Sequence, residues 1–136
     1  MNTNRPMNVF DIAGRAMSAQ LVRLNANASN LANAGTVSGT REGAYRAMRP
    51  VFTTVEESPG VATVHVDRVV PGGIEPTRRH APDHPLADAD GYVWEAGVDH
   101  AAELIEMVET ARQYQNNVQV LQTAKTLTLD TLKLGQ

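Results

Sequence analysis

The stretch that decides the fold runs from Asn8 to Asn33 and reads NVFDIAGRAMSAQLVRLNANASNLAN. Its apolar and small residues recur at alternating steps of four and three, which predicts a helix with one narrow apolar seam. The members of this seam are Phe10, Gly14, Met17, Leu21, Leu24, Ala28 and Leu31. Asn8 and Asp11 are placed to cap the first turn, and Gly35 is placed to end the helix. Because asparagine is a poor helix former and crowds the second half, we expect this helix to need a packing partner.

A second, longer helical pattern runs from Asp99 to Leu134. Asp99 is placed as its N-cap, with Glu103 in the first turn and Lys133 in the last, where the helix dipole favours these charges. Its seam consists of Leu104, Met107, Ala111, Tyr114, Val118 and Leu121. At about 1.5 Å per residue this helix is roughly 50 Å long. Little of the chain is left to cover both seams, which favours packing between molecules, while a helical hairpin within one chain stays open as the alternative.

The chain between the helices contains most of the glycines and prolines. Short strands interrupted at Pro50 are expected over residues 44–55. Residues 61–70 alternate between apolar and polar side chains, which predicts a half-buried strand with Val64 and Val66 on its apolar face. A turn at residues 71–73, a polar loop over 75–90 and a short strand at 92–95 complete this region. The Thr36–Gly43 stretch is small and polar and is expected to form a loop.

These patterns predict an α+β protein with three parts. The N-terminal helix occupies residues 1–35, a small β-rich insert occupies 36–97, and the C-terminal helix occupies 98–136. We expect the two helices to form one coiled-coil-like helical domain with the insert between them.

Composition excludes several classes of function. The net charge of −3 argues against a nucleic-acid binder, which usually carries a basic excess. The chain has no cysteine, so disulfides, thiol catalysis and zinc–thiolate sites are ruled out. No stretch approaches the ~18 apolar residues of a membrane span, and the first residues lack the apolar core of a secretory signal peptide.

One cluster of side chains has the composition of a metal site. It contains His80, Asp83, His84, Asp88 and Asp90. The spacing lacks the closing glutamate of a calcium loop, and no second ligand cluster supports it, so turn formation by the aspartates is favoured. A small metal-binding protein using His80, His84 and Asp88 is the alternative from another class. No catalytic motif is found, so we expect no enzyme activity, no cofactor and no metal.

Motifs at both ends of the chain resemble those of the bacterial flagellar rod and hook protein family. At the N-terminal end they are Phe10–Ala13, Ser18–Gln20, Arg23–Asn25 and Ala28–Ala34, the last containing Ser29, Asn30, Leu31 and Asn33. At the C-terminal end they are Arg112–Gln115, Asn117–Val118, Val120–Leu121 and Thr123–Lys125. In the middle, Tyr45–Arg46, Val51–Phe52, Pro82–Pro85 with His84 and Pro85, Ala87–Asp88, and Gly91, Tyr92 and Val93 are similar to the small proximal rod subunit. Asn27 and Trp94–Gly97 depart from the family pattern.

The resemblance implies a structural subunit of the proximal rod of the flagellar basal body, which crosses the periplasm and transmits torque. Such subunits pass unfolded through the flagellar type III export apparatus without a cleaved signal peptide. The implied partners are other rod subunits, hook–basal-body proteins and the export apparatus, with no nucleic acid and no direct membrane insertion. Assembly would proceed by packing of the terminal helices against neighbouring subunits. Another rod subunit of the same family is the alternative within the class.

Overall fold

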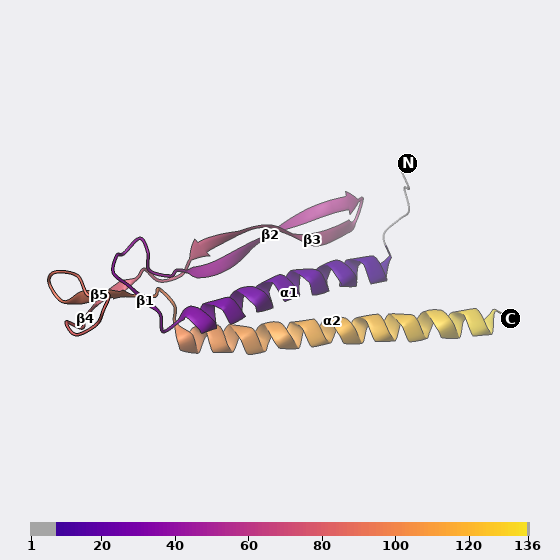
Figure 1. Cartoon of the computed structure of the whole chain (residues 1–136). Helices are drawn as coiled ribbons and strands as arrows, with labels where there is room; N and C mark the ends of the chain where they lie inside the picture. The colour runs from indigo at the N-terminus through magenta and orange to yellow at the C-terminus, as the bar shows by residue number, and fades with distance from the viewer. Residues whose placement is uncertain (1–7, 136) are drawn as a thin grey trace.

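Two terminal helices frame a β-rich middle (Figure 1). The computed structural model describes residues 8–135. In chain order the elements are α1 (Val9–Asn33), β1 (Val37–Ser38), β2 (Ala47–Ser58), β3 (Val61–Gly72), β4 (Thr77–His80), β5 (Tyr92–Glu95) and α2 (His100–Leu134). The predicted α+β class, with one long helix at each end and a small antiparallel β region between them, is confirmed.

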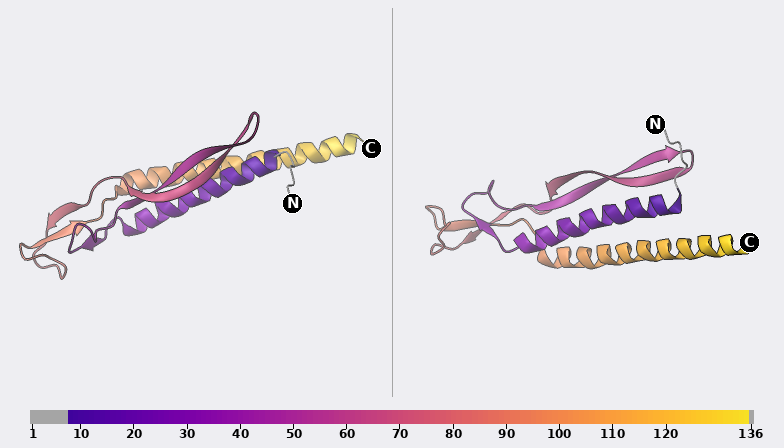
Figure 2. Two further views of the ribbon diagram at one scale, coloured as in Figure 1. Left: turned by 90° about the horizontal axis from the view of Figure 1, so that it is seen from above. Right: turned by 45° about the vertical axis from the view of Figure 1, so that its right-hand side comes forward.

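Helix α1 is the middle layer of an elongated molecule. It packs against α2 on one side and against both strands of the β2–β3 hairpin on the other (Figures 1 and 2). The two helices run antiparallel, and the small sheet of β1, β4 and β5 lies at the end where α1 finishes and α2 begins. Helix α2 extends past the first turn of α1, so its C-terminal turns project from the opposite end. Neither helix within residues 8–135 has an apolar stretch long enough to cross a membrane.

The helix starts follow the sequence prediction, whereas the end of α1 does not. Asn8 and Asp11 form a reciprocal capping box, and the Asp99 carboxylate accepts hydrogen bonds from the amides of Ala101 and Ala102. Gly35 does not adopt the left-handed conformation that a glycine stop would use. Instead the amide and the hydroxyl of Thr36 both donate to the Asn33 carbonyl, at 3.1 Å and 2.7 Å, and these bonds satisfy an acceptor at the helix end.

Two predictions about the hairpin are wrong. Pro50 does not interrupt β2, because a strand of a two-stranded ribbon has one open edge, where a missing N–H costs no ladder bond. The buried residue of β3 is Thr63, not a valine, and Val64 is 39 % exposed. A two-stranded ribbon lying over one helix is covered only along a narrow strip, and there Thr63 accepts a hydrogen bond from Arg15 Nη1 at 3.1 Å.

The small sheet has the order β1–β5–β4 and is antiparallel throughout. The predicted strand at residues 92–95 is confirmed as β5, whereas β1 and β4 lie in stretches that were expected to be loops. Both missed strands are short and polar, so only pairing with β5 stabilises them as strands.

The core is built from small residues. Among the described residues, the buried hydrophobic side chains are six alanines and two valines. Ala47, Ala96 and Val98 form a cluster where the small sheet meets the helices. Gly97 passes so close to the neighbouring chain there that a Cβ atom would lie 2.1 Å from the carbonyl oxygen of Ile74.

Candidate functional site

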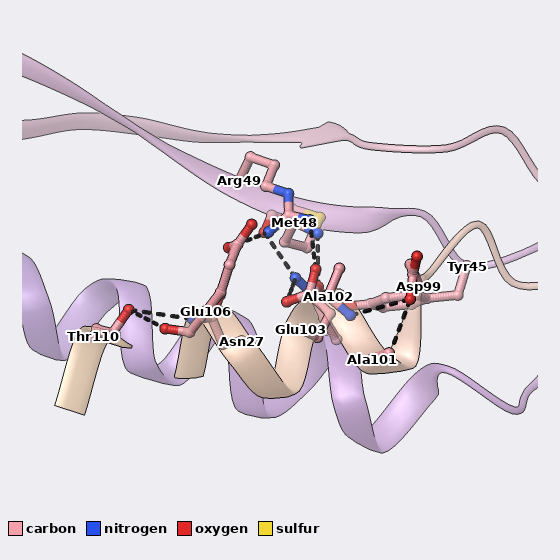
Figure 3. A network of polar contacts seen from close by, with 11 residues as sticks. Asn27, Tyr45, Met48, Arg49, Asp99, Ala101, Ala102, Glu103, Glu106 and Thr110 are labelled. Atoms are coloured by element: carbon pink, nitrogen blue, oxygen red, sulfur yellow. Dashed lines mark hydrogen bonds and ion pairs between the residues drawn. The ribbon is translucent and has the colours of Figure 1, made fainter. Parts of the chain in front are cut away.

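A buried asparagine near the C-terminal end of α1, Asn30, joins α1 to β2 and α2, and Figure 3 labels its partners Tyr45, Met48 and Glu103. The Asn30 side chain is fully buried and uses its full hydrogen-bonding capacity. Its Oδ1 accepts from the backbone amide of Met48 at 2.7 Å and from the Tyr45 hydroxyl at 3.0 Å. Its Nδ2 donates to the Met48 carbonyl and to Glu103 Oε2, both at 3.1 Å. One side chain therefore ties α1 to the start of β2 and to the first turn of α2.

Glu103 carries a negative charge into the same buried region. Its side chain is fully buried, and the Arg49 guanidinium lies 2.5 Å from Oε1. The same guanidinium reaches Glu106 Oε2 at 2.8 Å, so one arginine on β2 links two carboxylates one helical turn apart on α2. Because a buried charge without a partner is strongly destabilising, Arg49 is required to hold Glu103 in this position.

The network continues along the contact between the two helices. Asn27 Nδ2 donates to Thr110 Oγ1 at 3.5 Å, and the Thr110 hydroxyl donates to the Glu106 carbonyl. Arg23 Nη1 lies 3.4 Å from Gln113 Oε1, the last polar link in this series. We call the set Arg23, Asn27, Asn30, Arg49, Glu103, Glu106, Thr110 and Gln113 the polar lock. Its contacts lie at successive levels along the two helices, so we expect it to help define how far each helix is shifted along the other.

The sequence suggests other roles for two members of the polar lock, and it does not single out three others: Arg49, Glu106 and Thr110. Asn27 appeared as a departure from the family pattern, and Glu103 as a charge favoured by the helix dipole. Nothing local in the sequence marks Arg49, whose partners lie more than fifty residues away. The spacing of Glu103, Glu106 and Thr110 on one face of α2 is the one signal that points to a polar seam.

The predicted seam residues divide into two groups. Half-buried in the structure are Met17, Leu24, Leu31, Met107, Ala111, Tyr114, Val118 and Leu121. Exposed are Phe10, Gly14, Leu21, Ala28 and Leu104. On α2 the fully buried positions are Glu103 and Thr110, one residue before the predicted Leu104 and Ala111. The helices pack on one another within the chain, and the role of these residues in contacts between subunits stays a prediction.

The loop after β4 is organised by one aspartate, as the sequence predicted for this polar stretch. Asp88 Oδ1 accepts from the amides of Asp90 at 3.0 Å and Tyr92 at 2.9 Å, which closes a turn on Gly91. Gly91 has a φ of +78°, a conformation that favours glycine. The hydrogen bond from the Tyr92 amide, assisted by the Arg78 guanidinium, holds the pKa of Asp88 below its usual 3.8, although partial burial acts in the opposite direction.

The remaining family-motif residues have local structural contacts. Ser29 Oγ lies 3.2 Å from the Tyr45 hydroxyl, and Asn33 Nδ2 donates to the Ser29 carbonyl. His84 Nδ1 accepts from the Leu86 amide, next to the exposed Pro85. Val93, on the central strand β5 of the small sheet, is completely buried.

The histidines and aspartates of the candidate metal site do not converge. The His80 ring packs against the edge of Tyr92, with 5.0 Å between ring centroids, while His84 and Asp88 bond to neighbouring amides. Across residues 8–135 the structure brings together no group of three potential ligands that could hold a metal ion.

Comparison with known families agrees with the terminal motifs. The family described as "Flagella basal body rod protein" matches residues 10–38, which include nearly all of α1. The family described as "Flagellar basal body rod FlgEFG protein C-terminal" matches residues 89–134, which include β5 and all of α2. The two matches define the class of the protein, that of the flagellar basal-body rod proteins.

Individual relatives narrow the class further. The chain is 46% identical over 132 residues to the flagellar basal-body rod protein FlgC of Salmonella typhimurium, covering 96% of this chain and 98% of the relative. The FlgC protein of Escherichia coli O157:H7 gives the same figures. That of Buchnera aphidicola subsp. Schizaphis graminum is 34% identical over 135 residues, again covering 96% of this chain and 98% of the relative. The chain therefore belongs to the FlgC family of flagellar basal-body rod proteins, and the resemblance inferred from its motifs is confirmed.

Proposed function

We propose that the chain is a structural subunit of the proximal flagellar rod that assembles through the exposed faces of its two helices. In this proposal residues 1–35 and 98–136 act as one helical domain, and residues 36–97 form the insert. The predicted seam residues and their exposed neighbours on α1 and α2 contact other axial subunits.

The observation that carries this proposal is the surplus of exposed surface. The chain has an accessible surface of 9265 Å². A compact monomer of 14.7 kDa has about 6,900 Å² by the usual scaling with mass. The difference exceeds the ~800 Å² that one partner buries in a standard interface, so it is large enough for more than one neighbour.

Exposed apolar side chains on both helices support the same conclusion. Ile105 and Val108 are 68 % and 54 % exposed on α2, and Phe10 and Leu21 are exposed on α1. Full burial of such a side chain contributes about 1.5–3 kcal/mol, so a few of them offset the entropy lost on assembly. In the assembled rod, torque would pass through the helix contacts and through the polar lock that joins the hairpin to them.

The remaining parts of the proposal follow from family membership. The subunit would lie in the basal body, in the part of the rod that crosses the periplasm. It would reach that place through the type III export apparatus without a cleaved signal peptide. Its partners would be other rod and hook–basal-body proteins, with no nucleic acid, no insertion into the membrane and no catalytic reaction.

Single-cysteine crosslinking tests this assignment. The natural chain has no cysteine, so each introduced thiol is the only one in the subunit. Ile105→Cys on the outer face of α2 should crosslink to neighbouring subunits in isolated basal bodies from motile cells. Glu42→Cys, in the exposed loop between β1 and β2, is the matched control and should crosslink less. Basal bodies that contain the subunit but give equal yields for both thiols would contradict a helix-mediated assembly.

A further inference from the structure

The β2–β3 hairpin is divided by a β-bulge. The pairing register shifts between Val51 and Phe52, and Asp67 on β3 is left without a residue opposite it on β2. A bulge bends its strand and interrupts the ladder of hydrogen bonds, so the two parts of the hairpin are joined less rigidly there than within either part. We call the part beyond the bulge, residues 52–66, the strap, and the part before it the base of the hairpin.

The base of the hairpin is held firmly on both helices. Ala47 belongs to the buried cluster beside the small sheet. Met48 bonds to Asn30 of α1 through both its amide and its carbonyl. Arg49 pairs with two carboxylates of α2, one of them fully buried. The polar lock therefore fixes the base, and all of these contacts lie before the bulge.

One side chain on α1 holds the strap near its tip. The Arg15 guanidinium pairs with Glu57 on β2 and donates to Thr63 Oγ1 on β3 at 3.1 Å, so it links α1 to both strands. The strap lies along the first half of α1, on the side away from α2 (Figures 1 and 2). Both side chains of the Arg15–Glu57 pair are partly exposed, and ion pairs of this kind contribute little to stability.

The strap is loosely packed on α1. A groove of about 580 Å³ lies between them, and a second hollow of about 220 Å³ lies beside Gln20 and Phe52. Close-packed interiors contain few voids larger than a water molecule. Gln20 Oε1 is buried without a hydrogen-bond partner among the described residues, and an unpaired buried acceptor disfavours the closed position. The small and apolar side chains that line the groove are Ser18, Ala19 and Val22 on α1 and Val55, Val64 and Val66 on the strap.

We propose that the strap is hinged at the bulge and lifts from α1, while the polar lock keeps the base of the hairpin in place. Arg15 is the latch of the closed form. Lifting the strap uncovers Ala19 and Val22, so in the assembly proposed above it controls whether a neighbouring subunit reaches this face of α1. That consequence rests on the proposed function. The hinge itself is a property of the chain alone in solution, so its failure would leave the crosslinking test of assembly unaffected.

Thiol labelling measures the opening in the full chain. The natural chain has no cysteine, so Ala19→Cys and Ala26→Cys each introduce a single thiol on α1. Both alanines are buried, with exposed fractions of 4 % and 8 %. Ala19 lines the groove beneath the strap, whereas Ala26 immediately precedes Asn27 of the polar lock. A bulky maleimide should label Ala19→Cys roughly tenfold faster than Ala26→Cys, because local opening of the strap exposes only the first thiol.

Removing the latch tests its role. Arg15→Ala should accelerate the labelling of Ala19→Cys by a further factor of roughly ten and leave that of Ala26→Cys unchanged. Arg112→Ala removes the same charge from an exposed position on α2 and should change neither rate.

Amide exchange gives a second measurement on a chain without introduced thiols. A two-stranded hairpin that has left its helix is marginally stable, so the amides of the strap should exchange faster in Arg15→Ala, while those of the base keep their protection. Equal labelling rates of the two thiols would overturn the proposal. So would an Arg15→Ala substitution that accelerates exchange in the strap and the base alike, or in neither.

Discussion

Asn30 connects three segments of the chain through one side-chain amide group. Among the described residues, Asn25 on the same helix makes no side-chain hydrogen bond to another segment. Replacing Asn30 with alanine leaves the Met48 amide, the Met48 carbonyl and Glu103 without their partner. Since each buried polar group left unpaired costs about 1–3 kcal/mol, we expect the free energy of unfolding to fall by roughly 3–5 kcal/mol in Asn30→Ala. Urea denaturation followed by circular dichroism measures this change.

Asn25→Ala is the matched control for that substitution. Asn25 is exposed, and alanine is the better helix former by about 0.5 kcal/mol, so this variant should be as stable as the parent chain or slightly more stable. Equal destabilisation by both variants would show that helix propensity, and not the polar lock, determines the effect.

Asp88 makes the loop before β5 sensitive to acid. Its pKa is lowered in the folded state, so the ionised form is favoured by folding, and this stabilisation is fully present above the ordinary value of 3.8. As the pH falls through the lowered pKa, the carboxylate is protonated and the bonds from Tyr92 and Arg78 weaken. The protection of the Tyr92 amide, measured as its exchange rate relative to the intrinsic rate at the same pH, should therefore fall below pH 3.8 in the natural chain. In Asp88→Asn the exchange should lose this extra acid dependence; an unchanged profile would contradict the role of the carboxylate.

At the level of elements, two glycines differ in the space around them. Gly97 lies in a tight contact, whereas Gly14 lies in an open position. An added Cβ at Gly97 would meet the Ile74 carbonyl at 2.1 Å, whereas one at Gly14 on α1 would have no described atom within 4 Å. Gly97→Ala should therefore displace the small sheet from the helices and lower the melting temperature. Gly14→Ala should raise the free energy of unfolding by up to about 1 kcal/mol, because alanine favours the helix. Thermal unfolding of the two variants checks both signs.

The helix seams make a prediction about assembly. Leu24→Asp and Val118→Asp each place a charge at a half-buried position between packed helices, where an unpaired charge is costly. We expect each variant to abolish incorporation into the rod, measured as loss of swimming in a complemented strain. Thr53→Asp and Thr54→Asp add the same charge at exposed positions of β2, away from the two helices, and should swim normally. Normal swimming of either seam variant would show that the substituted residue does not lie in a contact that assembly requires.

The sequence predicts those elements whose signals are local. The caps at Asn8 and Asp99, the two helices and β5 follow from neighbouring residues, and the structure confirms them. The strand β4 and the polar lock could not be predicted, because each depends on a partner far along the chain. The ion pairs of Arg49 form only when β2 lies close to α2. No periodicity within β2 indicates that residue 49 will reach that helix.

For the whole molecule, the arrangement in layers determines which surfaces remain available. Helix α1 is covered from both sides, while α2 and the hairpin are each covered from one. The outer faces of these two elements, together with the two ends of the molecule, are the surfaces left for neighbours. Subunits placed along a shaft need contacts in the lateral and axial directions, and this shape offers surfaces for both.

The small-residue core has a consequence for calorimetry. Heat capacity rises when apolar surface is exposed on unfolding and falls when polar surface is exposed. Here unfolding would expose alanines and valines together with the buried Asn27, Asn30, Glu103 and Thr110. We therefore expect a heat-capacity increment per residue below the usual ~12–15 cal/mol/K, measured by scanning calorimetry. The free energy of unfolding would then vary little with temperature, so a cell swimming in cold or warm water would keep the same margin of stability in this subunit.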